Sequence, residues 1–243
     1  MISIEDIIWH ENNFARAFAQ VEERDYGLLF FNRDNPISHD SNHALILNLE
    51  CDLDAAIADV DGFYRGLGLG PRVNHGFVAG GSEILLPKLI TAGFETENFE
   101  EYYYEQIEAS KIAPVEEIEV RRIRELDAEI LDTFWTESPW SKGVIERQLL
   151  RADFHFLVGY VAGLPVTMAS LDVAKNVSRV DDVVTHPSHR RKGFSRALMH
   201  ELVKYHRQVS SHALYLYASD PSALKIYHEA GFRKMDWKPQ KWT

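Results

Sequence analysis

The sequence is poor in cysteine and has no long apolar segment. Cys51 is the single cysteine among 243 residues, so no internal disulfide can form, and a lone thiol is typical of the reducing cytoplasm. No apolar run approaches the roughly 20 residues that a membrane-spanning helix needs. The start of the chain, Met1–Asp6, is acidic and lacks the basic residues and apolar centre of a signal peptide. These absences favour a cytoplasmic protein and argue against a membrane partner.

Positive charge is also scarce, and it is unevenly distributed. The chain carries a formal net charge of −11. Residues 1–113 hold 7 Lys and Arg against 20 Asp and Glu, whereas residues 114–243 hold 19 against 17. An acidic chain repels the phosphates of nucleic acid, so nucleic acid is not expected as a partner. The asymmetry indicates two units with different roles, although a solvated acidic face would produce the same imbalance.

Apolar periodicity and turn residues predict mixed helices and strands in the first part of the chain. The expected helices are Asn12–Glu23, Asp54–Gly66 and Glu83–Ala92, and the expected strands are Tyr26–Phe31, His43–Leu49 and Tyr102–Ile107. Ile112–Pro114 is the best candidate for a linker. We therefore expect one domain over residues 1–113 and a second over residues 114–243.

Strands and helices alternate more regularly in residues 114–243. The expected strands are Ile118–Ile123, Phe154–Val161, Val166–Val173, Val177–Thr185 and Ala213–Tyr217, and the expected helices are Asp127–Trp135, Lys142–Leu150, Phe194–Val209 and Pro221–Ala230, with a turn at Thr136–Pro139. This order predicts an α/β fold in which helices pack on both faces of one sheet.

A basic loop joins the strand that ends at Thr185 to the helix that begins at Phe194. A strand followed by a short loop and a helix directs backbone N–H groups and the positive end of the helix dipole at one point, which suits a pyrophosphate. Charge for the phosphates comes from Arg190, Arg191 and Lys192. Gly193 and Ser195 are small enough for an anion to approach the backbone closely. A merely solvated basic loop is the alternative interpretation.

Two motifs in this region resemble signatures of the GNAT acetyltransferases. Arg190-x-x-Gly193-x-Ser195 is similar to the family's acyl-CoA pyrophosphate loop, which usually reads Gln/Arg-x-x-Gly-x-Gly/Ala. About thirty residues later, the chain continues with Asp220-x-x-Ala223-x-x-x-Tyr227-x-x-x-Gly231-Phe232, which resembles the second signature. An Asn often stands in the family where this chain has Asp220, so a side-chain amide contact from that position is in doubt.

The resemblance implies a mixed, mostly antiparallel sheet and direct transfer of an acyl group, most often acetyl, from acyl-CoA to an amine, without a metal. It further implies that the backbone of Val183, Val184 and Thr185 holds the pantetheine and polarises the thioester. Tyr227 stands at the position of the family's frequent general acid toward the leaving thiolate. A tyrosine packed in the core is the alternative for this residue.

The attacking amine must lose a proton, so a general base is required. Asp181 and Asp182 are the candidates, because both lie on the strand that leads to the thioester. Side chains alternate along a strand, so we expect only one of the two to face the cleft. Either residue can instead act through water, or serve as a structural partner of Arg179.

Other patterns point less clearly to chemistry. The pairs His39 with His43 and His186 with His189 have a spacing seen in metal sites, but they lack accompanying cysteines or acids, so turn and loop positions are the better interpretation. Cys51 has no basic neighbour in sequence to activate it. Trp135 and Trp140 lie where the GNAT family borders its acceptor, and core packing explains them equally well.

The function that these observations predict is N-acetylation of an amine by acetyl-CoA. A regulatory protein that binds acyl-CoA without turnover is the first alternative, and a transferase that uses aminoacyl-tRNA is a second, which the negative net charge disfavours. The acidic first part favours a cationic acceptor if it faces the cleft. That part also resembles a degenerate copy of the second, because Thr91-Ala92-Gly93-Phe94 echoes Glu229-Ala230-Gly231-Phe232, and it has no counterpart of the basic loop.

Overall fold

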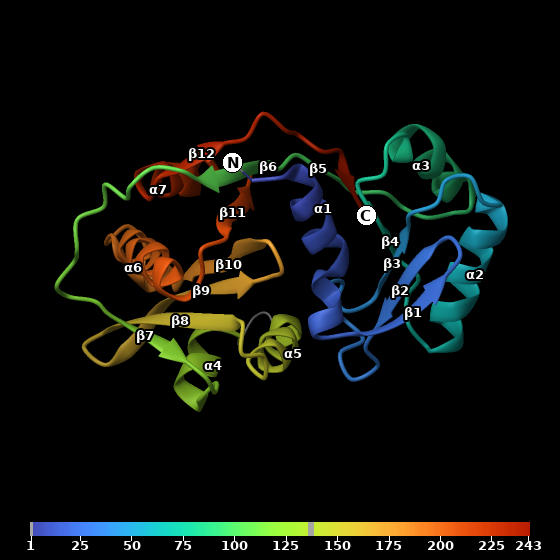
Figure 1. The fold of residues 1–243 in the computed structure, drawn as a ribbon. Coiled ribbons are helices and arrows are strands. Elements are labelled where there is room, and N and C mark those ends of the chain that lie inside the picture. The colour runs from blue at the N-terminus through green and yellow to red at the C-terminus, as the bar shows by residue number, and fades with distance from the viewer. Residues whose placement is uncertain (1, 136–138) are drawn as a thin grey trace. The chain divides into compact units, whose positions relative to one another are not determined.

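The computed structural model describes residues 2–135 and 139–243, which form two compact units (Figure 1). The large unit contains the described residues up to Ile7 and Tyr102–Lys238, and the small unit contains Ile8–Glu101 and Pro239–Thr243. The boundary expected between residues 113 and 114 therefore falls after Glu101. The reason is that the strand Tyr102–Gln106 pairs with two strands of the large unit, and the last five residues return to the small unit.

The large unit is built on a seven-stranded sheet with the order β12-β6-β11-β10-β9-β8-β7. The strands are β6 (Tyr102–Gln106), β7 (Glu119–Ile123), β8 (Phe154–Val161), β9 (Leu164–Val173), β10 (Val177–Thr185), β11 (Ala213–Ala218) and β12 (Phe232–Lys234). Neighbouring strands are antiparallel except β10 and β11, which are parallel and are joined through a helix. The expected mixed, mostly antiparallel sheet is confirmed.

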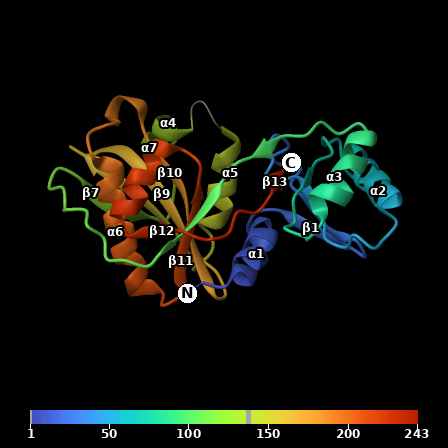
Figure 2. The same ribbon diagram turned by 90° about the horizontal axis from the view of Figure 1, so that it is seen from above.

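Helices cover both faces of this sheet, as the alternating pattern predicts. The helices are α4 (Ala128–Phe134), α5 (Pro139–Gln148), α6 (Phe194–Val209) and α7 (Pro221–Glu229). On one face, Leu198 and Leu202 of α6 are fully buried against Leu171 of β9. On the other face, Ile130 of α4 packs in the cluster that contains Met168 of β9. Figure 1 shows α6 and α4 on opposite sides of β8, and α6 and α7 lie next to each other in Figure 2.

The small unit repeats part of this arrangement on a smaller scale. Its four-stranded sheet has the order β1 (Gln20–Arg24), β2 (Gly27–Phe31), β3 (His43–Ile46) and β4 (Val73–Asn74), and a short pair joins β5 (Asn98–Phe99) to β13 (Lys241–Trp242). Again the only parallel neighbours of the four-stranded sheet are joined through a helix, since α2 (Leu53–Gly66) lies between β3 and β4. The helix α3 (Gly81–Thr91) follows β4 and packs on α2.

The helix expected over Asn12–Glu23 is wrong. A helix α1 (Ile4–Asn13) and a 3-10 turn (Phe14–Ala17) come first, and the chain is then extended as β1. The strand forms because five residues of β1 pair with β2 across a tight turn at Asp25 and Tyr26. Pairing across a hairpin outweighs a local helical pattern of apolar residues.

Two buried histidines should make folding sensitive to acid. Burial lowers the pKa of His43 in the small unit and of His206 in the large unit to about 4, below the ordinary 6.5. Their depressed pKa values contribute stability above pH 6.5 that is lost as the pH falls toward 4, because the unfolded chain binds these protons first. We expect each of the two histidines to lower the free energy of unfolding at pH 5 by on the order of 1–2 kcal/mol relative to pH 7.

Urea unfolding of the wild type and of His206→Leu at pH 7 and pH 5 measures this effect. His206 is suited to the comparison because its Nε2 has no hydrogen-bond partner among the described residues. The wild type should lose more stability than the variant between the two pH values. An equal loss in both proteins would contradict the assignment.

Candidate functional site

The sheet of the large unit opens between β10 and β11. Pairing between these two parallel strands covers only Val177–Arg179 and Ala213–Tyr215. Beyond Arg179, β11 continues along β6 and β10 continues along β9. Within the part of the chain that the structure describes, no strand therefore pairs with the β11-facing edge of β10 from Asp181 to Thr185. Such an edge can hydrogen-bond an extended ligand as if it were a further strand.

A β-bulge interrupts β10 at the opening. The register with β9 shifts between Asp181 and Val184, and Asp182 has a positive φ of 53°. Asp181 stands opposite Ser170, and the Ser170 hydroxyl donates a hydrogen bond of 2.7 Å to Asp182 Oδ2. Both carboxylates therefore gather on the face that carries Ser170. The bulge suspends the alternation of side chains along β10 on which the expectation of a single cleft-facing carboxylate was based.

Asp181 is also held by the residue two positions before it. The Arg179 guanidinium donates to Asp181 Oδ2, and the backbone N–H of Asp182 donates to Asp181 Oδ1 at 2.9 Å. The sequence-based alternative, in which one of the two acids is a structural partner of Arg179, is therefore confirmed for Asp181. Ser170 and Arg179 are part of this site, and the sequence signal for Ser170 was its place on the strand beside β10.

The loop after β10 leaves a helix N-terminus available to an anion. Pro187–His189 form a 3-10 turn, and Gly193 then caps α6 with a φ of 87°. No side chain caps α6, its first turn contains no acid, and a Cβ on Gly193 would meet no protein atom within 4 Å. The N–H groups of the first turn of α6 are thus free to bind an oxyanion.

The three cations before Gly193 are exposed to solvent. Arg190, Arg191 and Lys192 form no ion pair with an acid of the described chain, and Arg190 Nε donates to the carbonyl of Thr185 at 3.1 Å. Phe194 turns inward and is buried, whereas Ser195 is half-buried at the first turn. The open N–H groups of α6 and the exposed cations Arg190–Lys192 therefore lie next to each other, where the open edge of β10 ends.

Tyr227 lies on α7, only 8% exposed, in the apolar cluster formed with α6. Burial, together with the nearby charges of Asp181 and Asp220, raises the pKa of its phenol to about 12. The hydroxyl is therefore protonated at neutral pH, as a proton donor must be. The same burial also fits the core interpretation of this residue.

Asp220 has a structural role at the start of α7. Its side chain accepts hydrogen bonds from the backbone N–H and the hydroxyl of Ser222, each at 2.8 Å, and these bonds lower the pKa of Asp220. It is thus the N-cap of α7. Ala223, one turn further, packs against the core cluster of the sheet.

Of the remaining candidates, Trp135, His43 and Cys51 do not join this site. Trp135 is buried against Phe156 and donates to Ser141 Oγ at 2.6 Å, so it packs in the core, while the turn Thr136–Ser138 and the side chain of Trp140 lie outside the described residues. His43 opens β3 rather than lying in a turn, and Cys51 Sγ donates to a backbone carbonyl.

Neither a metal centre nor a membrane span emerges from the described residues. No three side chains of His, Cys, Asp or Glu in residues 2–135 and 139–243 are grouped as a metal ion would require. No helix in those same ranges has the length and apolarity to cross a membrane.

The fold and the opening define a class of protein. A mostly antiparallel sheet with helices on both faces is the arrangement that the resemblance to the GNAT acetyltransferases implies. Residues 118–232 match the model of the acetyltransferase (GNAT) family. This part of the chain is therefore a domain of the GNAT family, as the two motifs predict.

Solved structures resemble the whole chain. A GCN5-related N-acetyltransferase from Kribbella flavida superposes with a TM-score of 0.68 at 15% identity and covers 100% of this chain and 95% of its own. A functionally unknown conserved protein from Staphylococcus epidermidis gives 0.64 at 16% identity, covering 99% and 96%. At these identities the likeness concerns the fold alone. Among curated protein sequences, none matches this chain significantly.

Proposed function

We propose that the large unit transfers an acetyl group from acetyl-CoA directly to an amine. The observation that carries the proposal is the alignment of the open β10 edge with the uncapped N-terminus of α6. The pyrophosphate binds over Arg190–Ser195, where the N–H groups of α6 and the three cations provide charge. The backbone of Val183–Thr185 then holds the pantetheine in the opening between β10 and β11.

Proton transfer is assigned to the side chains beside the opening. The carboxylate pair Asp181 and Asp182 accepts the proton of the attacking amine, and Tyr227 donates one to the departing CoA thiolate. A carboxylate pair at this point also favours a cationic acceptor such as a polyamine, because the protonated amine is attracted before it reacts. The reducing cytoplasm, in which a lone thiol such as Cys51 persists, is the compartment that we propose.

Release of free CoA thiol tests the proposal. The protein is combined with acetyl-CoA and a panel that contains a polyamine, an aminoglycoside and several amino acids. We expect thiol release that depends on one class of amine and exceeds hydrolysis without an amine. If acetyl-CoA binds but no amine accelerates release, the regulatory alternative replaces the enzyme.

Replacement of Tyr227 by Phe should slow turnover more than it weakens binding. The hydroxyl matters only as the thiolate leaves, so its loss lowers kcat by about tenfold or more while the Kd for acetyl-CoA changes little. Single-turnover kinetics and calorimetry measure the two quantities. A wild-type kcat in this variant, with chemistry limiting the rate, would assign Tyr227 to the core alone.

The small unit is proposed to be a degenerate GNAT-like unit that binds no CoA. Its order β1-β2-β3-α2-β4-α3-β5 has the same pattern as β8-β9-β10-α6-β11-α7-β12 in the large unit. At the place of the basic loop, however, Asp52 caps α2 with its own carboxylate, which accepts from Ala55 N at 3.1 Å. A fixed carboxylate at this position repels a phosphate, and it also occupies the Ala55 N–H group that a phosphate would need as a hydrogen-bond donor.

Calorimetry should therefore give one acetyl-CoA per chain. The stoichiometry is measured with the full chain, and Arg190→Glu in the large unit should remove the single binding event. A second, independent site that survives in Arg190→Glu would contradict the assignment of the small unit.

A further inference from the structure

Arg179 is a buried cation at the point where the sheet opens. It is the last residue of β10 that pairs with β11, opposite Tyr215, and it is only 4% exposed. A buried guanidinium is costly unless its charge and its N–H groups are satisfied. The partners of the Arg179 guanidinium therefore indicate which structural role offsets the cost of its burial.

These contacts reach both strands that border the opening. The Nη2 group of Arg179 donates to Asp181 on β10 and to the hydroxyl of Tyr217 on β11, the latter at 3.1 Å. The guanidinium carbon also lies 4.9 Å from the centre of the Tyr217 ring, a cation–π distance. The last pair between β10 and β11 is Arg179 with Tyr215. Asp181 and Tyr217 are the next residues on the same face of the two strands, and the Arg179 side chain binds both of them.

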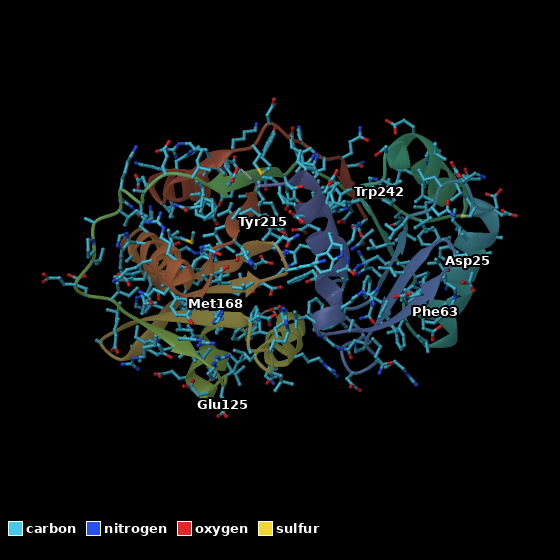
Figure 3. The ribbon with its side chains drawn as sticks, in the orientation of Figure 1. Asp25, Phe63, Glu125, Met168, Tyr215 and Trp242 are labelled. Atoms are coloured by element: carbon cyan, nitrogen blue, oxygen red, sulfur yellow. The ribbon has the colours of Figure 1, made fainter. Side chains whose placement is uncertain are left out.

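Aromatic packing fixes the Tyr217 end of this bridge. Tyr217 packs on Tyr103 of β6 at 5.6 Å between ring centres, and Tyr103 packs in turn on Trp237 at 4.7 Å and on Tyr215 at 6.1 Å. Tyr103 and Tyr215 are fully buried, and Tyr215 is labelled in Figure 3. Because Arg179 already occupies the Tyr217 ring, this ring is a support for Arg179 rather than a receptor for an acceptor cation.

We propose that Arg179 is a positioning residue for acyl transfer. It touches neither acetyl-CoA nor the amine, but it fixes Asp181 on β10 and Tyr217 on β11, and so it sets both the separation of the strands and the orientation of the Asp181 carboxylate. A lysine is not equivalent, because an ammonium has no planar group to stack on the Tyr217 ring while it donates to Asp181. The inference rests on the proposed acetyl transfer.

The variants Arg179→Lys and Tyr217→Phe test the proposal, with Arg207→Lys on the exposed side of α6 as the control. We expect Arg179→Lys to lower kcat by about tenfold or more while the Kd for acetyl-CoA stays within about threefold. Tyr217→Phe keeps the ring and removes the acceptor, so it should give a smaller fall in kcat in the same direction.

Hydrogen exchange provides a readout that does not depend on turnover. Amides of residues 180–185 and 216–218 should exchange faster in Arg179→Lys and in Tyr217→Phe than in the wild type or Arg207→Lys. Unchanged exchange and unchanged kcat in Tyr217→Phe would overturn the proposal, even if Arg179→Lys failed to fold. A wild type that shows no turnover with any amine would overturn the proposed function instead, and faster exchange in the variants would still support the bridge.

Discussion

Gly193→Val should weaken acetyl-CoA binding by at least about 100-fold, or roughly 2.7 kcal/mol. The added side chain points into the space before the uncapped N-terminus of α6, where no protein atom lies within 4 Å and where the pyrophosphate is proposed to bind. The valine also disfavours the positive φ of 87°, which by itself costs on the order of 1–2 kcal/mol. Calorimetry with acetyl-CoA measures the loss.

Gly163→Val is the matched control for this prediction. Gly163 lies in the β8–β9 hairpin with a φ of 86°, and a Cβ there also meets nothing within 4 Å. The two variants therefore carry the same backbone strain, and only one of them obstructs the proposed phosphate site. If Gly193→Val and Gly163→Val bind acetyl-CoA with equal affinity, the proposal that the pyrophosphate binds at this loop is wrong.

A fragment of residues 114–243 should fail to fold, although it contains the whole match to the GNAT family. It lacks β6, the strand between β11 and β12, and with it the buried side chains of Tyr103 and Tyr104. Removal of two buried aromatic side chains costs more than about 5 kcal/mol, which is comparable to the whole stability of a domain. The fragment should lack a cooperative thermal transition.

The comparison fragment is 102–238, which keeps all seven strands of the sheet. Circular dichroism should show a cooperative transition for this fragment and none for 114–243. If both fragments melt with the same cooperativity and midpoint, β6 does not contribute to the sheet in the way that its pairing implies.

The same pairing explains which parts of the fold the sequence could predict. The bounds of β8, β10 and α6 agree with the apolar periodicity, because these elements are long and end at clear turn residues. The pairing of β6 with β11 joins residues more than 100 positions apart, so nothing local in Tyr102–Gln106 indicates its partner. The strands β4, β5 and β13 have two residues each, too few to show a period.

The two halves of the sequence, rather than the two units, exchange strands. β6, which lies in the first half of the chain, stands between β11 and β12 in the sheet of the large unit, and β13, from the second half, pairs with β5 in the small unit. An exchange of strands depends on tertiary pairing alone. A domain boundary placed at a Pro-containing linker could not anticipate it.

Within the site, the loop was predictable and the opening was not. The strand that ends at Thr185 and the helix that begins at Phe194 have the bounds that the sequence predicts, so the loop between them was expected as well, with Gly193 as its last residue. The bulge at Asp182 leaves no signature in the sequence, since it arises from the shift of register with β9. The burial of Arg179 likewise depends on Tyr217, which lies 38 positions away.

Transfer of a labelled acetyl group tests the central claim most directly. The complex of the protein with acetyl-CoA carrying a carbon-13 acetyl group is mixed with an accepted amine in a single turnover, and product, CoA and protein are separated by mass spectrometry. Direct attack in a ternary complex predicts that the label passes to the amine and never appears on the protein. Label on the protein, or label that stays on CoA while the amine is unchanged, would contradict the account.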